Sequence, residues 1–160
     1  MRWFWIDKFV EFVPRVRATA TRSFTLGEDF LHDLWPDYPV VPNSVLIEGM
    51  AQTAGILVGE AGQFKEKVIL AKIGRATFSR LVRPGDTVTF GATIDQWADQ
   101  GASCTGRITA GEELIAQIEL MFSHIDRNMA GTEFPAHNFV FTESMMSLLR
   151  TRRQAASVPI

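Results

Sequence analysis

The sequence predicts an α+β fold in which an antiparallel sheet wraps around one long central helix. The helix is indicated by residues 44–58, SVLIEGMAQTAGILV, an apolar run too long for a typical strand and rich in good helix formers. Segments in which polar and apolar residues alternate follow it at short spacing, which is typical of an antiparallel meander. Because a single helix is available to cover the apolar face of the sheet, curling the sheet around it buries the most apolar surface.

The strands of this sheet are expected on both sides of the helix in the sequence. An aromatic and β-branched segment and then an alternating one precede the helix, and the turn signals RPGD, ADQG and AGEE divide the chain after it. The expected strands cover residues 3–13, 16–24, 68–82, 87–97, 102–109 and 114–122. The last three or four of them should form the meander.

Capping signals set the expected ends of the helices. Asn43 or Ser44 supplies an N-cap for the central helix, and Gly59 or Gly62 can end it. The helix is apolar almost all round, so it should be buried on most sides. A second, short helix is predicted in FTESMMSLLRTRR, with Thr142 as its N-cap.

Composition narrows the classes of function. The chain has 160 residues, enough for one domain with its own core. Its net charge of -2 means that the chain as a whole lacks the positive charge typical of nucleic-acid-binding proteins. Cys104 is the single cysteine, so an intrachain disulfide and a cysteine metal cluster are excluded. The N-terminus carries interspersed charges, and no apolar run approaches the roughly 20 residues of a membrane span. We therefore expect a cytoplasmic protein without metal, cofactor or membrane insertion.

Two polar residues interrupt the apolar helix. Glu48 and Gln52 are four residues apart and therefore share one face. With the helix starting at residue 44, Glu48 falls in its first turn, near the positive end of the helix dipole. One reading makes Glu48 a general acid that lines an internal pocket. The other makes it an ordinary first-turn glutamate that faces solvent or caps backbone N–H groups.

A rigid loop leads into the helix. Pro36, Pro39 and Pro42 in WPDYPVVPN stiffen the chain and withhold amide donors. A stiff loop before a helix N-terminus can hold a ligand carbonyl against free backbone N–H groups. A plain connector is the alternative.

The loop and helix together resemble the β-hydroxyacyl-[acyl-carrier-protein] dehydratases of the hot-dog fold. That family has His-Phe-Pro-Gly-x-Pro-Val-Met-Pro-Gly, then an acidic residue six positions after the last proline, then Ala-x-Ala-Gln. The positions that match are Pro36, Pro39, Val40, Pro42, Glu48, Ala51 and Gln52. The later segments LAKIGRATFSRLVRPGDTVTF and LIAQIELMFSHID are similar to the family's strands, so the resemblance covers roughly residues 3–126.

The resemblance implies a hot-dog domain over residues 1–127, followed by an extension over 128–160 that carries the short helix and packs on the domain or is partly flexible. It also implies a homodimer, or a trimer of dimers, with an acyl thioester in a tunnel at the dimer interface. Glu48 would transfer protons, and a backbone N–H at the helix start would polarise the thioester carbonyl. The expected substrate-binding residues are Leu34, Trp35, Val41, Asn43, Gln52 and Phe78. Arg80 and Arg83 would dock the acidic acyl carrier protein, or else belong to a solvated turn.

The sequence departs from the family pattern at the catalytic histidine, whose position is Leu34. Asp37 and Asn43 also replace family glycines. His32 lies two residues before Leu34, which in an extended segment is the same face displaced by about 6.5 Å. It is a candidate substitute for the missing histidine, with a surface histidine as the plainer reading. His124 and His137 have weaker claims.

Three functions compete. The first is a 3-hydroxyacyl-[acyl-carrier-protein] dehydratase-like enzyme of lipid biosynthesis, which the retained Glu48 and Gln52 favour. The second is a protein that binds an acyl thioester or the carrier, or partners an active dehydratase, without catalysis, and Leu34 favours it. The third is a thioesterase in which Glu48 activates water, and the retained Glu48 and Gln52 favour it as well.

Overall fold

The computed structural model describes residues 4–34, 37–128, 134–143, 145–147 and 149–150. Within these ranges the strands are β1 (Lys8–Val13), β2 (Arg17–Ser23), β3 (Val68–Phe78), β4 (Thr87–Ala98), β5 (Gly101–Ala110) and β6 (Glu113–His124). The helices are α1 (Asp29–Leu34), α2 (Asn43–Ala61) and α3 (Ile125–Asn128). One sheet contains these six strands in the order β1-β2-β4-β5-β6-β3, and every neighbouring pair is antiparallel.

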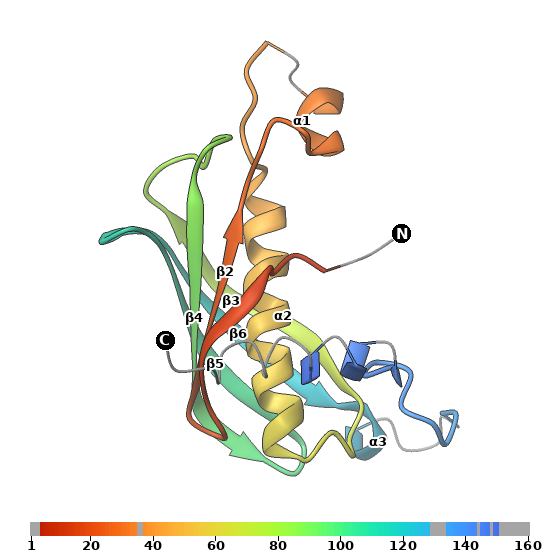
Figure 1. Cartoon of the computed structure of the whole chain (residues 1–160). Helices are drawn as coiled ribbons and strands as arrows, with labels where there is room; N and C mark the ends of the chain where they lie inside the picture. The colour runs from red at the N-terminus through yellow and green to blue at the C-terminus, as the bar shows by residue number, and fades with distance from the viewer. Residues whose placement is uncertain (1–3, 35–36, 129–133, 144, 148, 151–160) are drawn as a thin grey trace, which may run out of the picture.

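The sheet curves around α2, as the sequence predicts (Figure 1). Strands β4, β5 and β6 form the predicted meander. Strand β3 precedes β4 in sequence but pairs with β6 at the far edge of the sheet. It ends at Phe78 and not at the predicted residue 82. The Ser79 amide still donates to the Ile115 carbonyl oxygen of β6 at 2.8 Å, but the chain bends at residues 79–80, and Val82 pairs with Val41 instead. Its edge position leaves β3 exposed along almost its whole length.

Helix α2 packs closely on the sheet because two glycines remove side chains from the interface. A Cβ at Gly49 would lie 2.6 Å from Cζ of Phe90, which is fully buried in β4. A Cβ at Gly106 of β5 would lie 2.5 Å from the sulfur of Met50. The small residues of α2 therefore admit side chains from the sheet, which joins helix and sheet in a continuous core.

The N-terminal end of α2 differs from the expected cap, whereas the C-terminal end is at Gly62, one of the two predicted glycines. Helix α2 begins at Asn43 with Pro42 in the N-cap position, and no side chain caps it, so the predicted Asn43 or Ser44 cap is wrong. The Oδ1 atom of Asn43 is buried without a hydrogen-bond partner. At the other end Gly62 is the C-cap, and the guanidinium of Arg15 donates two hydrogen bonds to the Ala61 carbonyl oxygen, at 3.1 and 3.0 Å. The turn between β1 and β2 thus supplies one cation with two donor groups, which suits a helix C-terminus.

The described residues after α3 lie against the C-terminal half of α2 and the loop that follows it (Figure 1). We call the described residues from 134 to 150 the C-terminal extension. The Thr142 hydroxyl accepts from the Met145 amide at 3.3 Å, and residues 143, 145–147 and 149–150 are helical. This is the predicted cap with the predicted short helix. Phe141 and Leu149 of the extension are buried in the core.

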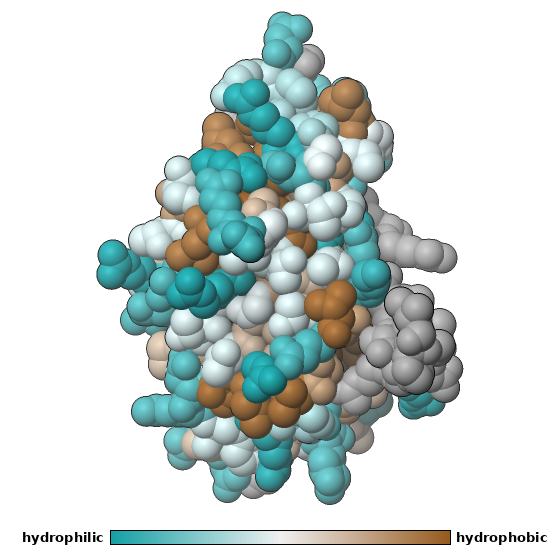
Figure 2. All heavy atoms as spheres, turned by 60° about the vertical axis from the view of Figure 1, so that its left-hand side comes forward, coloured by the Kyte–Doolittle hydropathy of each residue, from teal (hydrophilic) through white to brown (hydrophobic). Residues whose placement is uncertain are grey.

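The surface shows no single large apolar face in the view of Figure 2, where hydrophobic side chains stand in small groups among hydrophilic ones. Across the part of the chain that the structure describes, no helix combines the length and apolarity needed to cross a bilayer.

Candidate functional site

The polar face of α2 is organised as a chain of two hydrogen bonds. The Trp5 amide donates to Oε1 of Gln52 at 2.9 Å, and Nε2 of Gln52 donates to Oε1 of Glu48 at 2.9 Å. Because a backbone N–H can only donate, it fixes which end of the Gln52 amide faces Glu48. Glu48 is therefore held as a hydrogen-bond acceptor, through its carboxylate, and does not cap the helix.

Glu48 lies in the second turn of α2 and not in the first, because the helix begins at Asn43. The dipole of the helix acts mainly within the first turn, so its expected interaction with the Glu48 carboxylate is absent. The side chain is half-buried.

Glu48 opens onto a largely apolar cleft of about 180 Å³. Three parts of the chain form its walls: one face of α2, the β3–β6 edge of the sheet, and the C-terminal extension. The lining residues are Glu48, Ala51, Gln52, Gly55, Ile56, Val68, Leu70, Phe122, Val140, Phe141 and Met145. The cleft joins one carboxylate to an apolar channel, which suits a ligand with a reactive polar end and a hydrocarbon tail.

Of the described side chains expected to contact substrate, only that of Gln52 lines this cleft. Val41 is fully buried, and its amide donates to the Val82 carbonyl oxygen at 2.8 Å, which ties the proline-rich loop to the β3–β4 connection. Asn43 is half-buried at the start of α2, and Phe78 is half-buried at the end of β3. Trp35 and the side chain of Leu34 lie outside the described residues.

The structure changes the argument for His32. Residues 29–34 form α1, so the segment is helical and not extended as assumed from the sequence. Residues two apart in a helix do not share a face, so His32 cannot take the place of residue 34 by a shift along one face. The exposed ring of His32 donates through Nε2 to the Leu26 carbonyl oxygen at 2.6 Å and does not line the cleft.

The other two histidines are also away from the cleft. His124 is 1% exposed, its Nδ1 atom contacts the Asp99 carbonyl oxygen at 2.9 Å, and its ring lies 5.8 Å from that of Trp97. His137 is exposed in the C-terminal extension. Among the described residues, no group of three His, Cys, Asp or Glu side chains is placed to hold a metal ion.

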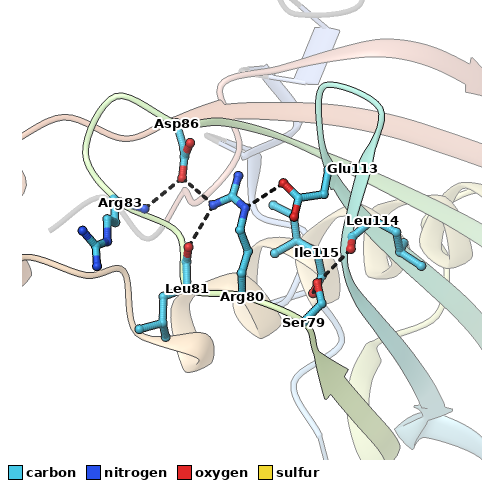
Figure 3. Close-up of polar contacts among 8 residues, drawn as sticks. All are labelled: Ser79, Arg80, Leu81, Arg83, Asp86, Glu113, Leu114 and Ile115. Atoms are coloured by element: carbon cyan, nitrogen blue, oxygen red, sulfur yellow. Dashed lines mark hydrogen bonds and ion pairs between the residues drawn. The ribbon is translucent and has the colours of Figure 1, made fainter.

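Arg80 is engaged within the chain (Figure 3). Its guanidinium donates to Asp86 at 2.9 Å, to Glu113 at 2.8 Å and to the Leu81 carbonyl oxygen at 2.9 Å. The hydrogen bonds to Asp86 and Glu113 raise the pKa of the Arg80 guanidinium further above its usual value. The hydrogen bond from Arg80 in turn lowers the pKa of Asp86. Arg80 therefore fastens the turn between β3 and β4 to the start of β6.

Arg83 occupies the same turn but faces the proline-rich loop. Its Nη2 atom donates to the Tyr38 hydroxyl at 2.6 Å, and its guanidinium lies 4.8 Å from the centre of that ring. Arg83 is exposed and is the one of the two arginines that presents its charge at the surface. Tyr38 was not foreseen as its partner, because the two residues are 45 positions apart.

The architecture, one antiparallel sheet wrapped around one helix, is the hot-dog fold. Solved structures share it at low sequence identity. The PaaI protein of E. coli, from the phenylacetic acid degradation operon, superposes with a TM-score of 0.59 at 14% identity over 75% of this chain and 79% of its own. A chain of the dehydratase heterocomplex ApeI:P from Xenorhabdus doucetiae gives 0.65 at 13% identity over 79% and 86%.

The sequence itself defines the family. The FabA-like domain matches residues 5–119. The 3-hydroxyacyl-[acyl-carrier-protein] dehydratase FabZ of Caldanaerobacter subterraneus subsp. tengcongensis is 34% identical over 118 residues, covering 73% of this chain and 84% of the relative. That of Clostridioides difficile is 30% identical over 123 residues, covering 76% and 87%. The chain belongs to the hot-dog-fold family of FabA-like and FabZ-like dehydratases of fatty-acid biosynthesis.

Proposed function

We propose that the chain binds an acyl thioester of acyl carrier protein in the cleft beside Glu48 and interconverts the 3-hydroxyacyl and trans-2-enoyl forms. The observation that carries the proposal is the position of Glu48, a half-buried carboxylate held by Gln52 at one side of an apolar cleft. The FabZ relatives are dehydratases that act on such thioesters, as their names state.

The chemistry requires two proton transfers. A base takes a proton from the α-carbon, a carbon–carbon double bond forms, and the β-hydroxyl leaves with its bonding electrons and gains a proton to become water. Glu48 can accept the first proton and return it to the leaving hydroxyl, so the carboxylate is regenerated. Leu34 stands where the family pattern has a histidine and cannot transfer a proton. A positioned acid or base contributes about 10²–10⁴ in rate, so we expect turnover slower by this factor than with both groups.

The start of α2 supplies a second element of the proposed site. The first amides of a helix have no intrahelical acceptor, and no side chain caps those of α2. They can donate to the thioester carbonyl oxygen and stabilise the charge that develops there when the α-proton leaves. Asn43, at the first position of the helix, would contact the substrate on this path.

A homodimer is supported by the edge strand β3. Ile69, Leu70 and Ile73 are 38%, 36% and 40% exposed on this strand, although all three are large and apolar. An open edge with apolar side chains is a ready surface for pairing with a second copy, and antiparallel pairing of two β3 strands would extend the sheet symmetrically. We propose this dimer, alone or within a trimer of dimers, in the cytoplasm, with Arg83 presented to the acidic carrier protein.

The second candidate function is binding without catalysis, as a partner of an active dehydratase. The replacement of the family histidine by Leu34 favours it.

The test is to incubate the purified protein with 3-hydroxyacyl and trans-2-enoyl carrier-protein substrates and to follow the loss and the addition of water. We expect slow turnover that Glu48→Gln abolishes and Leu34→His accelerates. Glu112→Gln, which neutralises an exposed carboxylate in the β5–β6 turn, is the matched control and should have no effect. Tight binding without turnover in either direction would favour the non-catalytic partner, and thioester hydrolysis lost in Glu48→Gln would favour the thioesterase. A His32→Ala variant with unchanged activity would remove His32 from the mechanism.

A further inference from the structure

Asn138 fastens the C-terminal extension to the loop that follows α2. The side-chain amide of Asn138 donates to the carbonyl oxygens of Phe64 and Glu66, each at 3.1 Å. Its Oδ1 atom accepts from the amides of Val140 and Phe141, each at 3.0 Å. One side chain therefore positions the extension and also shapes the turn that carries Phe141.

Phe141 fits against α2 because residue 59 has no side chain. A Cβ at Gly59 would lie 2.4 Å from Cζ of Phe141, closer than two carbon atoms can approach. The ring also packs edge-to-face on Phe64, with a centroid distance of 5.0 Å. Phe141 is 7% exposed, so it is a fixed part of the core and not a mobile cover.

Phe141 also lines the cleft, toward the C-terminal end of α2 and away from Glu48. Along α2 the lining runs from Glu48 to Gly55 and Ile56, and Phe141 covers the next turn at Gly59. Val140 and Met145 of the extension complete the wall. The matched family domain ends at residue 119, so these residues belong to a part of the chain outside that match.

We propose that the C-terminal extension sets the maximum length of the acyl chain, and that the ligand is a short to medium-length acyl thioester. The inference rests on the proposed function, since it assumes that the tail of the thioester occupies the cleft. The seven residue steps from Glu48 to Gly55 span about 10 Å at a rise of 1.5 Å each. An extended chain advances roughly 1.2 Å per bond, as it does in an extended peptide. The cleft therefore accepts about eight carbons before the chain meets Phe141.

Met145 offers the most direct test, because it is half-buried at the wall and does not anchor the extension. Met146 is the matched control: it is the same residue type, adjacent and half-buried, and it does not line the cleft. The probes are non-hydrolysable acyl-pantetheine thioethers with chains of about 4 to 16 carbons, and the measurement is Kd by calorimetry. Each methylene that enters the cleft should tighten Kd about four-fold, from the transfer free energy of a buried CH₂.

For the unaltered protein we expect this gain in affinity to stop near eight carbons, and we call that chain length the break. Met145→Ala should move the break to longer chains by roughly two carbons, because the substitution removes three heavy atoms from the wall. Met145→Trp should move the break to shorter chains. Met146→Ala should leave it in place. A gain that continues to 16 carbons, or a break that moves in neither Met145 variant, would overturn the inference while leaving the dehydratase proposal intact. A break that moves as expected, in a protein that never eliminates water, would support the inference and remove only the proposed catalysis. Absence of binding at every length would overturn both.

Discussion

Gln52 is the residue on which the geometry of the candidate site depends, and replacing it gives a quantitative test. Gln52→Met keeps the length of the side chain and removes both of its 2.9 Å hydrogen bonds to Trp5 and Glu48. A neutral hydrogen bond contributes about 1 kcal/mol and one to a charged group about 1.5–3 kcal/mol. Because Trp5 and Glu48 are only half-buried, water replaces part of what is lost. We expect a loss of about 1–2 kcal/mol in the free energy of unfolding.

Gln52→Glu tests the two hydrogen bonds separately, because it can keep the one from the Trp5 amide and removes the one to Glu48. The new carboxylate still accepts from the Trp5 amide but faces Glu48 four residues away, where two negative charges repel. The folded state then retains a proton that the unfolded chain releases, so stability should fall as the pH rises. We expect Gln52→Glu to lose more stability at pH 8 than at pH 5, whereas the loss in Gln52→Met should not depend on pH.

The assay is urea unfolding followed by circular dichroism at both pH values, with Glu112→Gln as the control. If Gln52→Met unfolds within about 0.5 kcal/mol of the unaltered protein, a range typical of neutral surface substitutions, the hydrogen-bonded chain does not hold Glu48. A Gln52→Glu variant with no dependence on pH would show that the two carboxylates do not face each other.

Two further predictions concern the frame around the site. Burial raises the pKa of Asp126, but hydrogen bonds from the Lys67 side chain and amide outweigh it and hold that pKa below its usual range. The ionised carboxylate therefore stabilises the fold when the pH is above the pKa of Asp126 in the unfolded chain, and this stabilisation is lost as the pH falls through its pKa in the folded protein. We expect Asp126→Asn to lower the free energy of unfolding by about 1–3 kcal/mol at pH 7 and by progressively less below about pH 4, as measured by urea unfolding. Burial, with a smaller effect from Asp95, raises the pKa of the Cys104 thiol to about 12, so iodoacetamide should label it only when the protein is unfolded; labelling of the native protein at the unfolded rate, read by mass spectrometry, would contradict this.

The elements that could be predicted are those whose pattern is local. The apolar run of α2 and the alternation in β2, β4, β5 and β6 fix both the type of each element and its buried face. Helix α1 has six residues, too few for a helical period to show, and its sequence was taken as extended. The edge position of β3 depends on pairing with β6, which the sequence of β3 alone does not encode.

The site divides in the same way. The shared face of Glu48 and Gln52 follows from their spacing, and Thr142 was foreseen as a cap from its residue type. The contact from Trp5 to Gln52 joins residues 47 positions apart, and no local signal marks it. The wall formed by Phe141 and Met145 depends equally on where the extension docks, which becomes visible only when the chain is folded.

The way Asn138 holds the extension has a consequence for how such a protein can change over generations. Its side chain binds carbonyl oxygens of Phe64 and Glu66, which every amino acid provides. A substitution at Glu66 therefore leaves this hydrogen bond available, whereas Phe64 also packs its ring on Phe141. Gly59 is different, because any larger residue there meets the Phe141 ring. The extension thus makes two demands on the rest of the chain, a ring at position 64 and no side chain at position 59, and the residues of its inner face are free to differ where ligands differ.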